Sequence, residues 1–97
     1  MKLQTDMIME IIKLGGLAWK EESVPGLPDI HCIYRGFIFY IEVKKGKDRL
    51  SEIQKQRMIQ LLEHNVPVLI LTDKNFSEVL NNVKKLIKSW DSLQDPE

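Results

Sequence analysis

The chain has 97 residues, of which 43% are hydrophobic and 29% are charged, and these values fit one compact domain with its own core. Fourteen basic and fourteen acidic side chains give a net charge of zero, which argues against a strongly basic nucleic-acid binder. A single cysteine, Cys32, excludes an internal disulfide and indicates a reducing, intracellular setting. No stretch approaches the ~20 apolar residues of a membrane span, so we expect a soluble protein.

The first half of the chain predicts one helix followed by three short strands. Residues 3–14 place apolar side chains at helical spacing, and a glycine pair follows them as at a helix C-terminus. Residues 17–22 form a short candidate edge strand before a turn-rich stretch. Two β-rich runs, 29–34 and 37–44, are separated by Arg35-Gly36, and this spacing predicts a β-hairpin.

The second half predicts a helix, a strand and a final helix. Ser51 begins a helix that runs to about Glu63. Residues 66–72 are a continuous apolar run typical of a buried strand, and apolar side chains from Phe76 to Trp90 stripe the last helix. The order αβββαβα predicts an α/β fold, a single domain with a central mixed β-sheet flanked by helices.

Charge is distributed unevenly along the chain. Residues 91–97 contain three acidic residues and no basic one, so residues 1–90 carry a net charge of +3, that is, 14 minus 11. We expect residues 1–90 to form the domain and residues 91–97 to be an acidic, mobile tail. The densest basic run is KKGKDR at 44–49, and from charge alone a solvated loop explains it.

The predicted hairpin brings charged side chains together. If Arg35-Gly36 is a two-residue loop, the residues that flank it pair with each other, and Asp29 then faces Glu42. Facing Cβ atoms lie about 4.5–5.5 Å apart, so two carboxylates there repel each other unless something neutralises them. Lys44 lies on the same face as Glu42, one pleat further along. Two acids and an ammonium at one place suit the binding of a hard divalent cation.

Each half of this pattern also has an ordinary structural explanation. Glu-x-Lys on a strand usually forms a solvated ion pair, and Pro-Asp usually marks a turn. Neither face of the strand at 37–44 is simply polar, however, so we expect both faces to be largely covered. A covered carboxylate needs a partner, which favours a functional interpretation of the combination.

The combination of Pro28-Asp29 with Glu42-Val43-Lys44 resembles the PD-(D/E)xK nuclease superfamily. More narrowly, the stretches GLPD and YIEVKKGKDRLSEIQ resemble the virus-type replication-repair nuclease (VRR-NUC) family, and the similarity runs from the first helix to about Thr72. The matching residues in chain order are Gly26, Pro28, Asp29, Glu42, Lys44, Gly46, Leu50, Ser51 and Gln54. The resemblance implies a restriction-endonuclease-like fold, with residues 1–90 as the nuclease domain.

The resemblance also implies a metal-dependent endonuclease that hydrolyses DNA phosphodiester bonds. Asp29, Glu42 and the backbone carbonyl of Val43 would hold Mg²⁺ or Mn²⁺. Lys44 would orient or activate the attacking water and stabilise charge at the scissile phosphate, and Gln54 would complete the catalytic set.

Two glutamines occupy the apolar stripes of predicted helices. Gln54 lies between apolar neighbours on the second helix, and Gln4 is placed in the same way on the first. A core-facing amide needs hydrogen-bond partners, because leaving it unsatisfied costs about 1–3 kcal/mol. We expect both to face a polar pocket at the sheet, and an amide bonded to nearby backbone is the alternative. Related chains often carry a glutamate where this chain has Gln4; Glu10, at the border of the stripe, is the other candidate metal ligand.

The basic run and the small size of the domain indicate which partners the protein would have. By the resemblance, Lys45, Lys47 and Arg49 would contact DNA phosphates. Stand-alone members of the family act as homodimers, which implies a homodimer here, with branched DNA such as a four-way (Holliday) junction or a flap as substrate. We expect a cytoplasmic protein encoded by a phage or a mobile element, and a bacterial host cell if it is phage-encoded. The alternatives are a non-catalytic nucleic-acid-binding or assembly module that retains the nuclease fold, and a structural protein whose carboxylates merely pair with lysines.

The remaining candidates have mainly structural explanations. We predict that Trp19 packs in the core or an interface, with stacking on a nucleic-acid base as the alternative. His31 is predicted to be a packed strand histidine, and Cys32 a small core residue rather than a nucleophile. Trp90 and Ile87 on the last helix are a candidate dimer surface, with ordinary sheet-covering core as the alternative.

Overall fold

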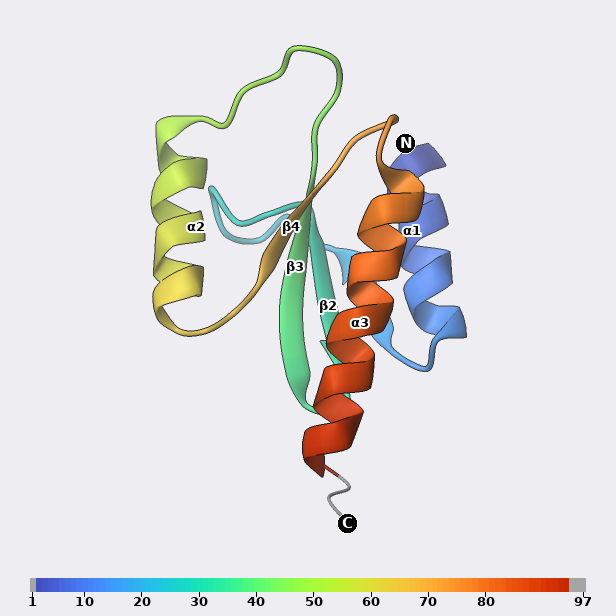
Figure 1. The fold of residues 1–97 in the computed structure, drawn as a ribbon. Coiled ribbons are helices and arrows are strands. Elements are labelled where there is room, and N and C mark those ends of the chain that lie inside the picture. The colour runs from blue at the N-terminus through green and yellow to red at the C-terminus, as the bar shows by residue number, and fades with distance from the viewer. Residues whose placement is uncertain (1, 95–97) are drawn as a thin grey trace.

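The computed structural model describes residues 2–94 as a four-stranded mixed sheet with three helices (Figure 1). The elements are α1 (Lys2–Lys13), β1 (Leu17–Lys20), β2 (Ile30–Tyr34), β3 (Phe37–Val43), α2 (Glu52–Glu63), β4 (Val68–Leu71) and α3 (Phe76–Gln94). The predicted α/β class and the order αβββαβα are confirmed. Within the described residues no helix is both long and apolar enough to cross a bilayer.

The strands β2 and β3 form the predicted hairpin. Arg35 and Gly36 both have positive φ, 48° and 83°, the combination that a two-residue type I′ turn requires. The residues that flank this turn pair with each other, and the pairing continues to Ile30 and Ile41 as the sequence predicted. β1 is antiparallel to β2, β4 is parallel to β3, and the strands lie in the order β1-β2-β3-β4.

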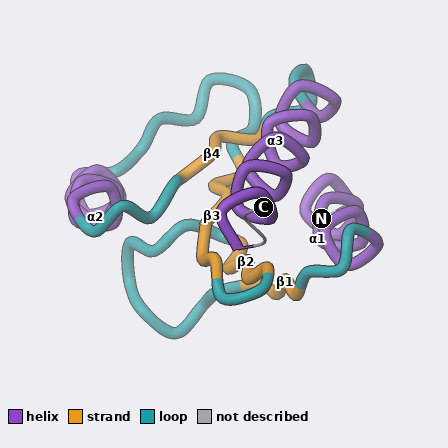
Figure 2. Tube along the Cα trace, turned by 60° about the horizontal axis from the view of Figure 1, so that its bottom comes forward, coloured by secondary structure: helices purple, strands orange, loops and turns teal. Residues whose placement is uncertain are grey.

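The helices cover the two faces of the sheet unequally. α1 and α3 lie together on one face, and α2 lies on the other (Figure 2). Alternate residues of the strands point towards α1 and α3, as the two-residue period of a strand requires. The resulting core contains Met7, Ile11, Ile30, Cys32, Phe39, Ile41, Val43, Leu71, Val79, Val83 and Ile87.

The α2 side of the sheet is only partly covered. α2 has no buried residue, and Leu17, Trp19 and Ile38 on the sheet are 62%, 42% and 40% exposed. The expectation that both faces of β3 are largely covered is therefore wrong for the end that carries Ile38, because α2 stands beside the carboxyl-terminal part of β3 (Figure 1). At that covered end Tyr40 and Glu42 are buried.

The last helix is longer than the sequence predicted. α3 continues to Gln94, past the boundary expected at residue 90. Asp91 ties this part of the helix to the hairpin turn, since it accepts a hydrogen bond from the Tyr34 hydroxyl at 2.9 Å and pairs with Arg35 at 2.7 Å. Residues 91–94 of the expected mobile tail are therefore helical, and residues 95–97 lie outside the described part of the chain.

Candidate active site

Asp29 and Glu42 meet where β2 begins and β3 ends. Asp29 immediately precedes β2, and its backbone N–H donates to Glu42 Oε1 at 3.2 Å. The backbone N–H of Val43 donates in turn to Asp29 Oδ2 at 2.9 Å. The structure therefore brings together the two carboxylates that the hairpin register placed opposite each other, and reciprocal backbone hydrogen bonds hold them there.

Glu42 is a buried carboxylate, only 2% exposed, on the sheet face that α2 covers. Burial raises the pKa of Glu42, the charge of Asp29 raises it further, and the hydrogen bond and charge of Lys44 lower it. Glu42 Oε2 accepts a hydrogen bond from Gln54 Nε2 at 2.8 Å and lies 3.2 Å from Lys44 Nζ. One cation and one amide donor thus offset part of the repulsion between the two acids.

Lys44 is held at three points. Its ammonium lies 3.2 Å from Glu42 Oε2, and it donates to Gln54 Oε1 and to the carbonyl oxygen of Arg49, both at 3.2 Å. An ammonium has three N–H donors, so these three partners account for all of them. The side chain is 16% exposed, and it lies with Glu42 as the period-2 pattern predicted.

Gln54 connects the first turn of α2 to this cluster. Ser51 caps α2: its Oγ accepts a hydrogen bond from the backbone N–H of Gln54 at 3.2 Å, and Gln54 Oε1 accepts one from the backbone N–H of Ser51 at 2.9 Å. These reciprocal bonds form a capping box, which fixes the glutamine side chain at the start of the helix. Because the same side chain contacts Glu42 and Lys44, the polar pocket predicted for Gln54 is present.

The loop before Asp29 is clamped against α2. Gly26 has a φ of +83°, and a Cβ at this position would lie 2.8 Å from side-chain carbons of both Ile53 and Arg57. Glycine alone combines this backbone conformation with so close an approach. Arg57 completes the clamp, since its Nε donates to the carbonyl oxygen of Pro25 at 3.2 Å.

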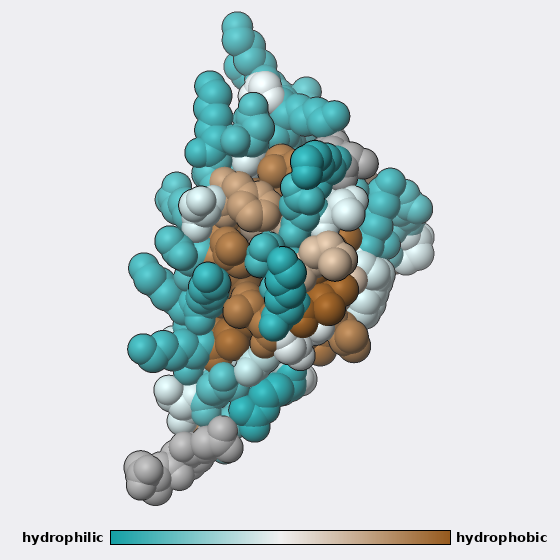
Figure 3. Space-filling view, turned by 90° about the vertical axis from the view of Figure 1, so that its right-hand side faces the viewer, coloured by the Kyte–Doolittle hydropathy of each residue, from teal (hydrophilic) through white to brown (hydrophobic). Residues whose placement is uncertain are grey.

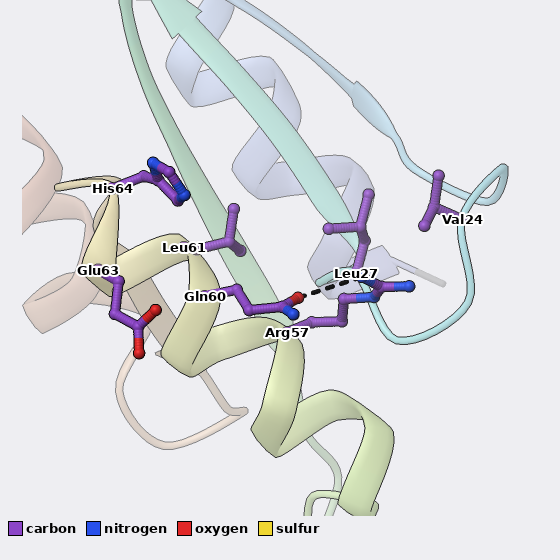
Figure 4. Close-up of a pocket in the computed structure, with 7 residues that line it drawn as sticks. All are labelled: Val24, Leu27, Arg57, Gln60, Leu61, Glu63 and His64. Carbon is purple, nitrogen blue, oxygen red and sulfur yellow. Dashed lines mark hydrogen bonds between the residues drawn. The ribbon is translucent and has the colours of Figure 1, made fainter.

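A pocket of about 450 Å³ lies between this loop and α2 (Figure 4). It is lined by Val24, Leu27, Arg57, Gln60, Leu61, Glu63 and His64. Inside it, Arg57 Nη1 donates to Gln60 Oε1 at 3.1 Å (Figure 4). No predicted site residue lines this pocket, which is therefore separate from the acidic cluster.

The two candidate ligands on α1 are not joined to the acidic pair. Gln4 is buried, 8% exposed, as its place in the apolar stripe predicted. Among the described residues, however, no hydrogen bond links its side chain to Asp29 or Glu42. Glu10 lies 3.6 Å from Lys13, one turn further along α1, in an ordinary surface ion pair.

The loop between β3 and α2 presents cations beside the cluster. Lys45, Lys47 and Arg49 are exposed, and within residues 2–94 none of them forms an ion pair with an acidic side chain. Two hollows open near this loop: Lys44 and Lys45 contribute to one of about 280 Å³, and Lys47 and Lys74 contribute to one of about 470 Å³. Phosphates next to the acidic pair would therefore meet several cationic side chains that pair with no described acidic residue.

The sequence also made predictions for three other residues, and the structure agrees with some of these predictions but not with all of them. Cys32 is fully buried, and burial raises the pKa of its thiol to about 12, so it is the inert core residue that was predicted. His31 is packed as predicted, since its ring stacks on Trp19 and meets Tyr40 edge-on. Trp19 was predicted to pack in the core or an interface, and the core alternative is wrong, because α2 does not reach β1 and the indole is 42% exposed.

The oxygen donors of Asp29 and Glu42 fit a small, hard cation. Mg²⁺ in proteins is usually held by one or two carboxylates, with water and substrate oxygens as its other ligands. The described residues contain no group of three or more His, Cys, Asp or Glu side chains that could share an ion. Burial and the charge of Asp29 raise the pKa of Glu42, and a dication bound beside it would favour its charged form.

Two contributors to the site were missed in the sequence. The Ser51–Gln54 capping box has a recognised signature, Ser-x-x-Gln before a helix, and it was therefore detectable. Glu21 has no such signal. Its backbone N–H donates to the Asp29 carbonyl at 2.7 Å, which extends the β1–β2 pairing, and its carboxylate lies 3.7 Å from His31 Nδ1.

Comparison with known proteins bears on the fold. No protein-family model and no curated protein matches this chain. A solved structure described as a "VRR_NUC domain" superposes on it with a TM-score of 0.68 and 21% sequence identity, covering 82% of this chain and 91% of that one. At this level of identity the likeness concerns the fold. The resemblance inferred from the sequence motifs is thus confirmed for the architecture, and the chain is a single small α/β domain with the VRR-NUC nuclease fold.

Proposed function

We propose that this protein is a metal-dependent DNA endonuclease and that Asp29, Glu42, Lys44 and Gln54 form its catalytic set. One observation supports this most directly: these side chains, from two strand ends and one helix, form a single hydrogen-bonded cluster beside exposed lysines. A structural ion pair needs one acid and one base, whereas this cluster buries an acid beside a second acid. Such costly arrangements are concentrated at functional sites.

In this proposal Asp29, Glu42 and the Val43 carbonyl would hold Mg²⁺ or Mn²⁺, because hard divalent cations prefer oxygen ligands. A divalent cation there would polarise water and offset the charge of the scissile phosphate. Gln4 and Glu10 stay candidates for a contribution from α1. Glu10 would have to leave Lys13, while Gln4 brings an amide without charge.

The residues of the chain itself position the reacting groups. Lys44 offsets the charge of Glu42 and, because its side chain reaches solvent, it can orient water or a phosphate oxygen by exchanging one of its three partners. Gln54 fixes both neighbours, since it donates to Glu42 and accepts from Lys44. The backbone N–H of Ser51, which donates to Gln54 Oε1, holds the Gln54 side chain in this position.

Lys45, Lys47 and Arg49 would bind the DNA backbone. They are exposed and lie in the loop that follows Lys44. Phosphate contacts position a protein on DNA but carry no sequence information, so selectivity has to come from the shape of the DNA. We therefore propose branched DNA, a four-way junction or a flap, as the preferred substrate over plain duplex.

A homodimer is part of this proposal, because two sites related by a two-fold axis could cut two strands symmetrically. Ile87 and Trp90, the candidate dimer surface on the last helix, pack within the monomer. Ile87 belongs to the core, and Trp90 stacks on Phe37 with ring centroids 5.4 Å apart. On the side that carries α1 and α3, apolar side chains lie between charged ones (Figure 3). Met9 and Ile12 on α1 are 50% and 46% exposed. A phage-encoded dimer in the cytoplasm of a bacterial host completes the proposal.

Incubation with Mg²⁺ or Mn²⁺ and labelled junction, flap or linear DNA tests the activity. We expect cleavage of branched DNA that falls by at least about 10²-fold in Asp29→Asn and in Glu42→Gln. Asp91→Asn is the matched control, since Asp91 is a carboxylate that contacts Tyr34 and Arg35 away from the cluster. An absence of cleavage by the wild type under conditions in which it binds the DNA would overturn the proposal.

A non-catalytic DNA-binding or assembly module is the second candidate. It is favoured by the presence of Gln4, a buried neutral amide, in the α1 stripe, at a position where the resemblance to the nuclease family often implies an acid. This function predicts DNA binding without cutting, unchanged by Asp29→Asn. Gln4→Glu separates the two: a cleavage rate that rises in this variant indicates a nuclease limited by the missing acid, whereas no cleavage by either protein supports the module.

A further inference from the structure

Trp19 is an exposed aromatic side chain on the same sheet face as the acidic cluster. It pairs with His31 on β2, and His31 pairs with Tyr40 on β3. Paired residues point to the same face, and Tyr40 and Glu42 share a face because they are two residues apart on one strand. The indole therefore belongs to the side of the sheet that carries the site, at the edge strand β1.

The ring of Trp19 is held in a fixed orientation. The Trp19 and His31 rings are stacked, with centroids 4.5 Å apart and planes 12° apart, and His31 meets Tyr40 edge-on at 4.7 Å. Both ring nitrogens of His31 are buried without a hydrogen-bond partner among the described residues, so this histidine contributes to the stack through its ring. One indole face is thus covered, and the 42% exposure of Trp19 leaves surface for another flat ring.

The stack lies close to the acidic pair. Asp29 precedes His31 by two residues, and Glu42 follows Tyr40 by two. Two residues of strand span about 7 Å, and neighbouring strands lie about 4.8 Å apart. A phosphate held at Asp29 and Glu42 would therefore have the next nucleotide of an extended strand within reach of Trp19.

We propose that Trp19 is a stacking platform for an unpaired DNA base next to the scissile phosphate. The proposal rests on the proposed nuclease function, because it takes the Asp29–Glu42 pair as the place of that phosphate. The basic residues Lys45, Lys47 and Arg49 lie in the loop that follows Lys44 at the end of β3. The platform instead lies beside exposed Leu17 and Ile38. This division matches a nucleotide, which has a charged backbone and a flat base of low charge.

The platform narrows the class of substrate. A base inside a duplex is stacked on its neighbours and cannot cover the indole unless it leaves the helix. A base in a single strand is already free to do so, and stacking on an aromatic side chain tolerates any base. The substrate is therefore DNA with an unpaired nucleotide at the cleavage position, such as a flap, rather than fully paired DNA.

Binding without metal tests the platform independently of cleavage. In Trp90→Phe, Trp19 is the sole tryptophan, and we expect its fluorescence to be quenched by oligothymidine in EDTA but not by a blunt duplex. Trp19→Ala should weaken oligothymidine binding by about tenfold and Trp19→Phe by less, while duplex affinity stays unchanged. Trp90→Phe is the matched control, since this tryptophan packs on Phe37 on the other face, and it should bind DNA like the wild type.

Four results would overturn the platform. The first is an equal affinity of the wild type and Trp19→Ala for oligothymidine. The second is the absence of fluorescence quenching in Trp90→Phe, a result that can be obtained even if Trp19→Ala fails to fold. The third is self-association without DNA that buries Trp19 and is lost in Trp19→Phe, which would make this patch a contact between copies. Cleavage that proceeds with an unchanged flap-to-duplex ratio in Trp19→Phe and Trp19→Ala would reject the platform but keep the nuclease. Trp19-dependent binding of oligothymidine without any cleavage of DNA would keep the platform but reject the nuclease.

Discussion

Glu42 shows what a buried carboxylate beside a second carboxylate requires. Its oxygens are bonded by the Gln54 amide, the Lys44 ammonium and the backbone N–H of Asp29. These donors come from α2, from the end of β3 and from the loop before β2, so the charge of Glu42 is stabilised only when all three segments are assembled. The acidic pair is therefore a product of the complete fold rather than of the hairpin alone.

The pH dependence of stability should report on Glu42. Its folded pKa lies above the ordinary value of 4.5, so its contribution to stability is fully present below that value and is lost as pH rises through the folded pKa. The glutamine side chain in Glu42→Gln does not ionise, so this variant does not lose that contribution to stability as pH rises. In metal-free protein we therefore expect the free energy of unfolding of Glu42→Gln, relative to wild type, to increase from about pH 4 to about pH 8. Urea titrations of both proteins measure this, and a difference that is flat or decreases with pH contradicts it.

Two substitutions should separate the structural and the chemical roles of Gln54. Ser51→Ala removes the cap of α2 and leaves the contacts of Gln54 with the cluster, so we expect a loss of about 1 kcal/mol in stability with little change in cleavage. Gln54→Glu can keep the capping box but cannot donate to Glu42, so we expect cleavage to fall roughly 10–100-fold. Denaturation and cleavage rates of the two variants provide the comparison. Equal losses of cleavage would mean that Gln54 acts only through the helix.

At the scale of elements, α2 differs from the other helices in what holds it against the sheet. It contains no buried residue, whereas α1 and α3 each contribute to the core. The bonds of Gln54 to Glu42 and Lys44, the bond of Arg57 to Pro25 and the close approach of Gly26 fix it instead. Since α2 carries Gln54, the geometry of the cluster depends on this clamp.

The two glycines with the same φ provide a matched test of the clamp. Gly26 and Gly36 both have φ of +83°, so alanine meets the same backbone cost at each, about 1–2 kcal/mol. A methyl group at Gly36 meets nothing within 4 Å, but at Gly26 it collides with Ile53 and Arg57. We expect Gly26→Ala to be the less stable variant and to lose cleavage, while Gly36→Ala keeps it. Chemical denaturation and cleavage assays check both points, and equal effects would argue against the clamp.

The identity of every element was predictable from the sequence, but the packing of α2 was not. Periodicity identifies α1 and α3 because each places its apolar residues on one covered face. The β-rich composition on either side of Arg35-Gly36 identifies β2 and β3. The apolar neighbours of Gln54 suggested a covered helix in the same way, although α2 stands against a sheet side that is open at one end. The end of α3 was misplaced because it depends on the contact of Asp91 with the hairpin turn, which local sequence does not encode.

At the scale of the whole molecule, the two sides of the sheet have different tasks. The side covered by α1 and α3 contains the apolar core, and the α2 side carries the charged cluster and the Trp19 stack. Substitutions on the α2 side can therefore change activity with smaller effects on stability. The hairpin register and the nuclease-like motif together predicted how Asp29, Glu42 and Lys44 meet. The exposure of Trp19 was not predictable, because it depends on how far α2 extends over the sheet.

The central claim is that Asp29 and Glu42 share a divalent cation, and a crystal of the protein soaked with Mn²⁺ tests it most directly. We predict an anomalous peak about 2 Å from a carboxylate oxygen of each residue, with the Val43 carbonyl as a further ligand. The peak should disappear in crystals of Glu42→Gln and persist in Asp91→Asn. Saturating Mn²⁺ that binds elsewhere, or that leaves Asp29 and Glu42 bonded only to Lys44, Gln54 and the backbone, would contradict the account.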